Sequence, residues 1–203
     1  SVIDHVGGSQ PIVSYVGESP ELAMVFNGCI YNNTTLRDEL IGLGAAFTSD
    51  HSDTETLFKA YQQWGGDCTD HLDGMYAAVI WDRRTCQLSF FRDPYGQKPL
   101  YILDLGQAGD GCIFCSNPEP LQSIATELGL TNISTSALQR YLQLGYLTSS
   151  DTLIEPVKCV GQSTPLIQPT SETIEGAIRG SVIDHIESDV PLGCFLSGGV
   201  DSS

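Results

Sequence analysis

The chain has 203 residues, 41% of them hydrophobic, which is enough for one sizeable domain and part of a second. Its 25 acidic residues outnumber its 9 basic residues, and the resulting net charge of −16 disfavours binding to nucleic acid or to anionic membranes. No apolar run approaches the roughly 18 residues of a membrane span, so we expect no membrane-spanning segment. The acidic charge suits a cytoplasmic protein.

The first elements predicted along the chain are an apolar run and a helix. Residues 22–26 form the run, and the Asn27-Gly28 pair after it by itself predicts a turn. A helix fits residues 35–43, because leucines recur on one face and Gly44 follows as a stop.

A second helix and a series of strands come next. Ser52 and Glu55 have the spacing of a capping box, which predicts a helix that begins there and ends at Gly65. The length of the connection at 82–85 predicts a hairpin, so we expect antiparallel pairing. Short segments rich in strand-forming residues lie at 75–81, 87–92, 100–105 and 112–116.

The rest of the chain predicts three more helices. Asn117-Pro118 is typical of an N-cap followed by proline at the first helical position, and another helix fits 136–144. Strand-like residues lie around 153–160, and a Pro-Thr-Ser cluster at 169–171 predicts a linker. Beyond the linker, isoleucine and valine residues four apart predict an amphipathic helix over 174–186.

The seven cysteines have no spacing typical of a disulfide framework. Cys112 and Cys115 form the only Cys-x-x-Cys pair, and they lie in a stretch that reads as a strand. Residues three apart on a strand point to opposite faces, whereas a metal site needs converging ligands. We therefore expect buried free thiols in a reducing compartment and no metal site.

The last seven residues, Ser-Gly-Gly-Val-Asp-Ser-Ser at 197–203, predict a phosphate-binding loop. Adjacent glycines let backbone N–H groups converge on an anion, and the apolar run before them reads as a buried strand. A Walker A motif is excluded, because no lysine lies nearby. A surface turn rich in glycine and serine is the alternative. Since the chain starts without methionine and stops inside this pattern, we expect it to be a fragment.

Five segments together resemble the glutamine-hydrolysing asparagine synthetases. They follow in that family's order at 26–32, 52–55, 73–82, 92–101 and 188–203. The resemblance implies an α+β fold whose first domain, residues 1–168, is an N-terminally truncated class II glutamine amidotransferase. That domain would be an N-terminal-nucleophile type α/β/β/α sandwich with antiparallel sheets. Residues 169–203 would be a linker and the first helix, strand and phosphate loop of a truncated α/β ATP-pyrophosphatase domain.

The resemblance also implies a reaction. ATP, with Mg²⁺, would activate the β-carboxylate of aspartate as an adenylate, and ammonia released from glutamine would convert it to asparagine. The small-molecule partners would be glutamine, aspartate and ATP, and the family allows a homodimer. Two alternatives remain open: a relative that amidates another carboxylate, as β-lactam synthetases do, and a catalytically dead regulatory or scaffold relative.

Site residues are implied by position in the matching segments. Asn27 and Gly28 would form the oxyanion hole. Without the family context, Asn27-Gly28 reads as a hairpin turn, and Asp53 reads as an acid favoured by the helix dipole. The implied glutamine-binding residues are Val2, Ile3, Asn27, Gly28, Cys29 and Asp53. The implied ATP-binding residues are Leu196, Ser197, Gly198, Gly199, Asp201 and Ser202.

Three departures from the family pattern affect these expectations. The nucleophilic cysteine and an arginine that the family places before Ser1 are absent, so we expect the 203-residue chain to be inactive. Cys29 occupies a position where the family usually has glutamate, and a substitute nucleophile there is an alternative to a small pocket residue. The connection after Gly161 is shorter than the family's usual segment between the two domains. This leaves open whether the carboxylate that is amidated belongs to aspartate or to another molecule.

Overall fold

The first sheet has four strands, all antiparallel to their neighbours. The computed structural model describes residues 9–106, 111–148, 151–161 and 174–184. Within these residues, the sheet order is β1-β2-β3-β4. The strands are β1 (Ile12–Val16), β2 (Ser19–Ile30), β3 (Gly74–Asp82) and β4 (Gln87–Arg92).

Two helices cover one face of this sheet. They are α1 (Asn33–Gly42) and α2 (Asp53–Trp64), and the 3₁₀ turn η1 (Gly65–His71) follows α2. Alternate residues of a strand share a face, so every second residue of β2 points toward the helices. The resulting core includes Leu22, Met24, Phe26, Ile30, Leu36, Leu40 and Leu57.

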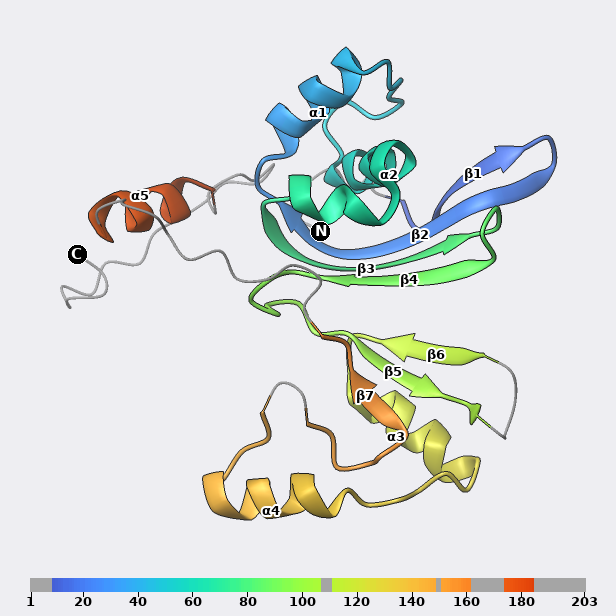
Figure 1. Ribbon diagram of the computed structural model, residues 1–203, viewed down its shortest axis with the longest axis vertical. Coiled ribbons are helices and arrows are strands. Elements are labelled where there is room, and N and C mark those ends of the chain that lie inside the picture. The colour runs from blue at the N-terminus through green and yellow to red at the C-terminus, as the bar shows by residue number, and fades with distance from the viewer. Residues whose placement is uncertain (1–8, 107–110, 149–150, 162–173, 185–203) are drawn as a thin grey trace.

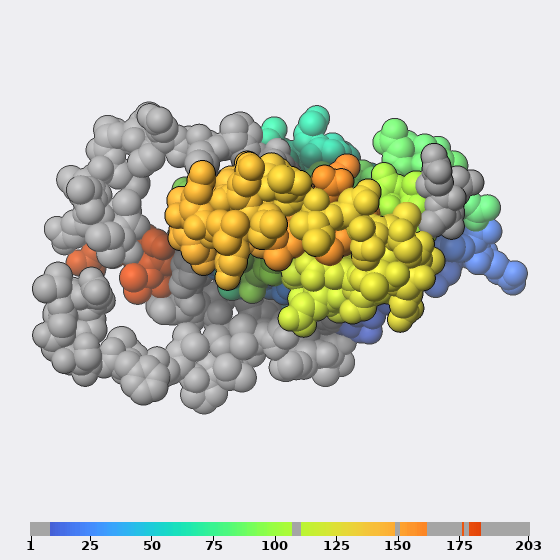
Figure 2. All heavy atoms as spheres, turned by 90° about the horizontal axis from the view of Figure 1, so that it is seen from below, coloured from blue at the N-terminus to red at the C-terminus, as the bar shows by residue number. Residues whose placement is uncertain are grey.

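In the described part of the chain, the second sheet has three strands in the order β6-β5-β7. They are β5 (Tyr101–Asp104), β6 (Cys112–Cys115) and β7 (Val157–Cys159). Helix α3 (Pro118–Glu127) packs on this sheet through Leu121 and Ala125. Figure 2, viewed from below, shows α3 and α4 (Thr135–Leu144) on the outer face. The last described element is α5 (Ile174–Asp184).

The two sheets lie face to face between their helices (Figure 1). Phe90 of β4 meets Phe114 of β6 edge to face, with ring centroids 6.0 Å apart, and Ala77, Val79 and Leu100 are buried in the same cluster. The layers therefore run helix, sheet, sheet, helix, and the predicted mixed α/β fold with antiparallel sheets is confirmed. Among the described residues, no helix has the length and apolar character needed to cross a membrane.

Arg92, at the end of β4, ties the two sheets together. Its guanidinium donates to the backbone oxygens of Gly96 (2.7 Å) and Lys98 (2.8 Å) in the loop that leads to β5. The same group donates to the backbone oxygen of Val160 (2.9 Å), just after β7. Because Arg92 is only 5% exposed, these bonds are shielded from water and hold the loop firmly between the sheets.

Asp93 organises the same loop through its carboxylate, which accepts hydrogen bonds from backbone N–H groups. Its side chain is fully buried, and its carboxylate accepts a hydrogen bond from the backbone N–H of Tyr76 in β3 (3.3 Å). Three more backbone N–H groups within the loop donate to this carboxylate, from Tyr95, Gln97 and Lys98. Bonds to an ionised acceptor are stronger than neutral ones, so Asp93 sets the path of the chain from the first sheet to the second.

The predicted capping signals are largely confirmed. The Asn117 side chain accepts a hydrogen bond from the Glu119 N–H (3.1 Å), and the Ser52 hydroxyl accepts one from the Glu55 N–H (3.5 Å). Gly145 ends α4 with φ of +77°, in the left-handed region that favours glycine. The expected hairpin between β3 and β4 is also present.

Two sequence-based expectations differ from the structure. Strand β2 continues through Asn27 and Gly28, which pair with Ala77 and Tyr76, so the predicted turn is wrong. The strand-like stretch at 153–160 is a strand only over Val157–Cys159. The strand expected before the phosphate loop, and the boundary expected at residue 168, lie outside the described residues.

Candidate functional site

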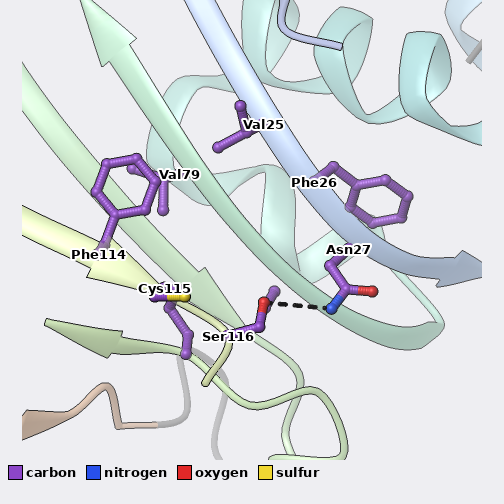
Figure 3. Close-up of a pocket in the computed structure, with 9 residues that line it drawn as sticks. Val25, Phe26, Asn27, Val79, Phe114, Cys115 and Ser116 are labelled. Carbon is purple, nitrogen blue, oxygen red and sulfur yellow. Dashed lines mark hydrogen bonds between the residues drawn. The ribbon is translucent and has the colours of Figure 1, made fainter. Parts of the chain in front are cut away.

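A cavity of about 210 Å³ lies between the two sheets, beside the second half of β2 (Figure 3). Its walls are mostly apolar, and Asn27 and Ser116 bring polar side chains to it. A small number of polar groups in an apolar pocket is typical of small-molecule sites. The lining residues are Val25, Phe26, Asn27, Ala77, Val79, Leu100, Phe114, Cys115 and Ser116.

The side chain of Asn27 is exposed and held from the second sheet. Its Nδ2 donates to the hydroxyl of Ser116 at 3.4 Å, as Figure 3 shows. An asparagine amide carries two N–H groups, so it can contact Ser116 with one and donate to a ligand with the other. Sequence reasoning did not single out Ser116. The only signal was a polar residue at the end of the predicted strand at 112–116, and Asn27 and Ser116 are 89 positions apart in the sequence.

Gly28 lies on the edge of β2 that, among the described residues, pairs with no strand beyond Met24. Two residues before it, the Phe26 N–H donates to the side-chain oxygen of Gln10 (2.6 Å); two residues after it, the Ile30 N–H donates to Asp53 Oδ2 (3.2 Å). Backbone N–H groups alternate between the two edges of a strand. The Gly28 N–H therefore points to this same edge, between the side chains of Gln10 and Asp53.

Asp53 begins α2 and is only 3% exposed. Its bond to Ile30 places the carboxylate at the end of β2, two residues beyond Gly28 along the strand. The start of a helix favours a negative charge, so this position stabilises the ionised carboxylate whether or not it binds a ligand. Cys29 is buried opposite Met75 and shares the strand face of Asn27. The structure thus brings four of the expected glutamine-site residues to one strand end.

The other expected site residues lie outside the described residues. These are Val2 and Ile3 of the glutamine pocket and Leu196, Ser197, Gly198, Gly199, Asp201 and Ser202 of the ATP loop. Within the described part of the chain, no group of three or more histidine, cysteine, aspartate or glutamate side chains could hold a metal ion.

Glu55 braces the loop that leads into α2. Its Oε1 accepts hydrogen bonds from the Thr48 N–H (2.8 Å) and hydroxyl (3.0 Å). Its Oε2 accepts from the Ser49 N–H (2.7 Å) and hydroxyl (2.5 Å). Burial raises the pKa of Glu55, but the bonds from Ser49 and Thr48 together outweigh burial and hold this pKa below its ordinary value of 4.5.

We expect this carboxylate to make stability depend on pH. Because the pKa of Glu55 is lower in the folded state, its contribution is present above about pH 4.5 and is lost as the pH falls through the folded pKa. Glu55→Gln should lower the free energy of unfolding by about 1–3 kcal/mol at pH 7 and by less at pH 3. Urea titrations across this range would show it, with exposed Glu127→Gln as control. A pH-independent difference would contradict the prediction.

Comparison with known proteins shows which family has this architecture. Residues 1–175 match the family model described as "Glutamine amidotransferase domain", and residues 173–203 match the model described as "Asparagine synthase". The chain belongs to the glutamine amidotransferase domain family.

Individual relatives are similar along the whole chain. It is 34% identical over 227 residues to asparagine synthetase [glutamine-hydrolyzing] 1 of Bacillus subtilis, covering 100% of this chain and 34% of the relative. It is 29% identical over 228 residues to asparagine synthetase [glutamine-hydrolyzing] 3 of the same organism, covering 100% of this chain and 36% of the relative. The chain thus spans about a third of the length of these curated relatives. The expected resemblance to glutamine-hydrolysing asparagine synthetases is confirmed.

One solved structure that aligns with part of the chain is the glutamine phosphoribosylpyrophosphate amidotransferase from B. subtilis, complexed with ADP and GMP. It aligns with a TM-score of 0.46 at 25% identity, covering 59% of this chain and 26% of that chain.

Proposed function

We propose that this chain is the glutamine-hydrolysing part of an asparagine synthetase, which amidates aspartate with ATP and with ammonia taken from glutamine. The observation that carries the proposal is the succession of two family matches in one chain, an amidotransferase domain over 1–175 and the asparagine synthase match from 173. We place the boundary between the two parts at residue 168, directly before the predicted linker.

The geometry at the end of β2 supports a role in glutamine hydrolysis. In our proposal, the Asn27 amide and the Gly28 N–H stabilise the oxyanion that forms when the side-chain amide of glutamine is attacked. Preorganised donors of this kind act without reorganising during the reaction. Asp53 then binds the α-ammonium of glutamine, since its carboxylate lies at the same strand end. Val2, Ile3 and Cys29 line the remainder of the glutamine pocket in this proposal.

For the second half of the reaction, we assign ATP and Mg²⁺ to the loop at the end of the chain. The assigned residues are Leu196, Ser197, Gly198, Gly199, Asp201 and Ser202. ATP supplies the activation that makes the carboxylate of aspartate electrophilic. Glycine-rich backbone and hydroxyl donors suit the phosphates of ATP. The assignment is supported by the asparagine synthase match over 173–203.

We also propose a cytoplasmic location. None of the six cysteines with described positions is in a disulfide, although Cys115 and Cys159 both neighbour Tyr101 across the second sheet. Only Cys29 and Cys68 of the six are buried, so the expectation of buried thiols is wrong for the Cys112 and Cys115 pair. Free thiols in this number are typical of a reducing compartment. A homodimer stays a prediction from the family resemblance.

The test is an assay of the full-length product of the gene with aspartate, ATP and either glutamine or ammonia. We expect asparagine, pyrophosphate and, with glutamine, an equal amount of glutamate. Formation of ADP instead of pyrophosphate would contradict the acyl-adenylate route. Glutamate release without asparagine would favour another acceptor carboxylate, and the absence of both products would favour a non-catalytic relative.

A further inference from the structure

The segment just before α2 is held from both helices that cover the first sheet. From α1, the Arg37 guanidinium donates to the backbone oxygen of Ser49 and lies 3.9 Å from the ring centroid of Phe47. Also from α1, the Asn33 amide donates to the backbone oxygen of His51 (2.9 Å). From α2, Glu55 accepts four hydrogen bonds from this segment. Residues 47–51 therefore have little freedom to move.

The Ser49 hydroxyl connects Glu55 to the start of α2. It donates to Glu55 Oε2 (2.5 Å) and accepts a hydrogen bond from the Ser52 N–H (3.3 Å). The Ser52 hydroxyl in turn accepts from the Glu55 N–H (3.5 Å). In a capping box the glutamate would itself accept from the Ser52 N–H. Here the Glu55 carboxylate is linked to the Ser52 N–H only through the Ser49 hydroxyl. It also accepts hydrogen bonds from the Ser49 N–H and from the N–H and hydroxyl of Thr48.

Hydrogen bonds join Ser49, Ser52 and Glu55 in a closed ring. Asp53 directly follows Ser52 in the chain. Ser52 is the N-cap, so its backbone orientation determines how the first helical residue leaves the loop. That residue is Asp53, whose carboxylate reaches the Ile30 N–H (3.2 Å) at the end of β2. A small rotation at Ser52 would therefore move the Asp53 carboxylate away from the strand end.

We propose that Glu55 is a positioning residue for glutamine: through Ser49 and Ser52 it holds Asp53 where the α-ammonium of the substrate binds. This inference rests on the proposed function. Glu55 does not contact the substrate in this arrangement, since both of its oxygens accept hydrogen bonds from the loop. Preorganised side chains of this kind increase affinity because less ordering is needed when the ligand binds.

The experiment uses the full-length enzyme and compares its use of glutamine with its use of ammonia. Glu55→Gln keeps the size of the side chain but presents an NH₂ group where one oxygen accepted two bonds. We expect the KM for glutamine to rise about tenfold while kcat changes less than twofold. Ser49→Ala, a milder change that removes the hydroxyl between Glu55 and Ser52, should raise the KM in the same direction by a smaller factor. Glu127→Gln, on the exposed face of α3, should leave the KM unchanged.

A double-mutant cycle separates positioning from a general loss of stability. Asp53→Asn should raise the KM for glutamine by itself. Adding Glu55→Gln to it should raise the KM by less than a further twofold, because there is no longer a carboxylate to position. If Glu55 only stabilised the fold, the two effects would multiply, and kcat with ammonia would fall along with kcat with glutamine.

An unchanged KM for glutamine in Glu55→Gln would overturn the positioning role, even if the variant melted at a lower temperature. So would multiplicative effects in the cycle. The proposed function fails in a different way, through the absence of glutamine-dependent asparagine formation in the unmodified enzyme.

Discussion

Asn27→Ala is expected to lower kcat for glutamine hydrolysis by about 100- to 1000-fold in the full-length enzyme, which is the usual cost of removing one oxyanion-hole donor. The amide of Asn27 lies at the polar side of the cavity between the sheets, held by Ser116. Its contribution grows as charge develops on the substrate oxygen, so the KM for glutamine should change much less than kcat. Glutamate release at saturating glutamine measures the effect.

Two further variants test whether the loss of kcat is specific to the Asn27 amide. Asn132→Ala removes an exposed asparagine that does not line the cavity and should leave glutamate release unchanged. Ser116→Ala keeps Asn27 but removes the hydroxyl that orients its amide, so its effect on kcat should have the same direction and be smaller. Asparagine formation from ammonia does not require glutamine hydrolysis and serves as the internal reference. Undiminished glutamate release in Asn27→Ala would exclude the amide as an oxyanion donor.

Gly28→Ala is expected to destabilise the 203-residue chain by roughly 4 kcal/mol or more, or to prevent folding. A Cβ at this position would lie 2.2 Å from the backbone oxygen of Met75 and 2.8 Å from the Cα of Tyr76. Both are backbone atoms of β3, so the contact cannot be relieved by rotating a side chain. The strands would have to separate at the end where Asn27 and Asp53 lie.

Urea unfolding followed by circular dichroism would measure this loss of stability, together with the soluble yield. The matched control is Gly42→Ala at the end of α1, where an added Cβ meets no atom within 4 Å and φ is not positive. Because alanine favours the helix more than glycine does, we expect this control to be neutral or up to about 1 kcal/mol more stable. Equal losses in the two variants would show that the close approach of β2 and β3 is not the cause.

Local patterns in the sequence were sufficient for most elements. The N-caps at Ser52 and Asn117 and the left-handed glycine at 145 are determined by bonds and dihedral angles within a few residues. The predicted strand at 87–92 coincides with β4. These features could be predicted because the interactions that specify them connect residues close in sequence.

The site itself could be predicted only in part. Asn27-Gly28 by itself predicts a turn, yet both residues lie in a strand, because β3 approaches so closely that only glycine fits at position 28. Ser116 and Gln10 carry no local pattern that connects them to Asn27 and Phe26, from which they are separated by 89 and 16 residues. The capping-box spacing of Ser52 and Glu55 was correct, but the bonds of the carboxylate to Thr48 and Ser49 were not expected.

The sequence by itself therefore determined the family and the order of the described helices and strands, and it predicted Asn27, Gly28 and Asp53 as candidate site residues. The tertiary structure decided which chemical groups meet there. It placed the Gly28 N–H on the strand edge where the Ile30 N–H meets Asp53, the Asn27 amide against Ser116, and the Glu55 carboxylate on the loop before α2. The physical reason is that these contacts depend on how two sheets and two helices pack, which no short segment of the chain specifies.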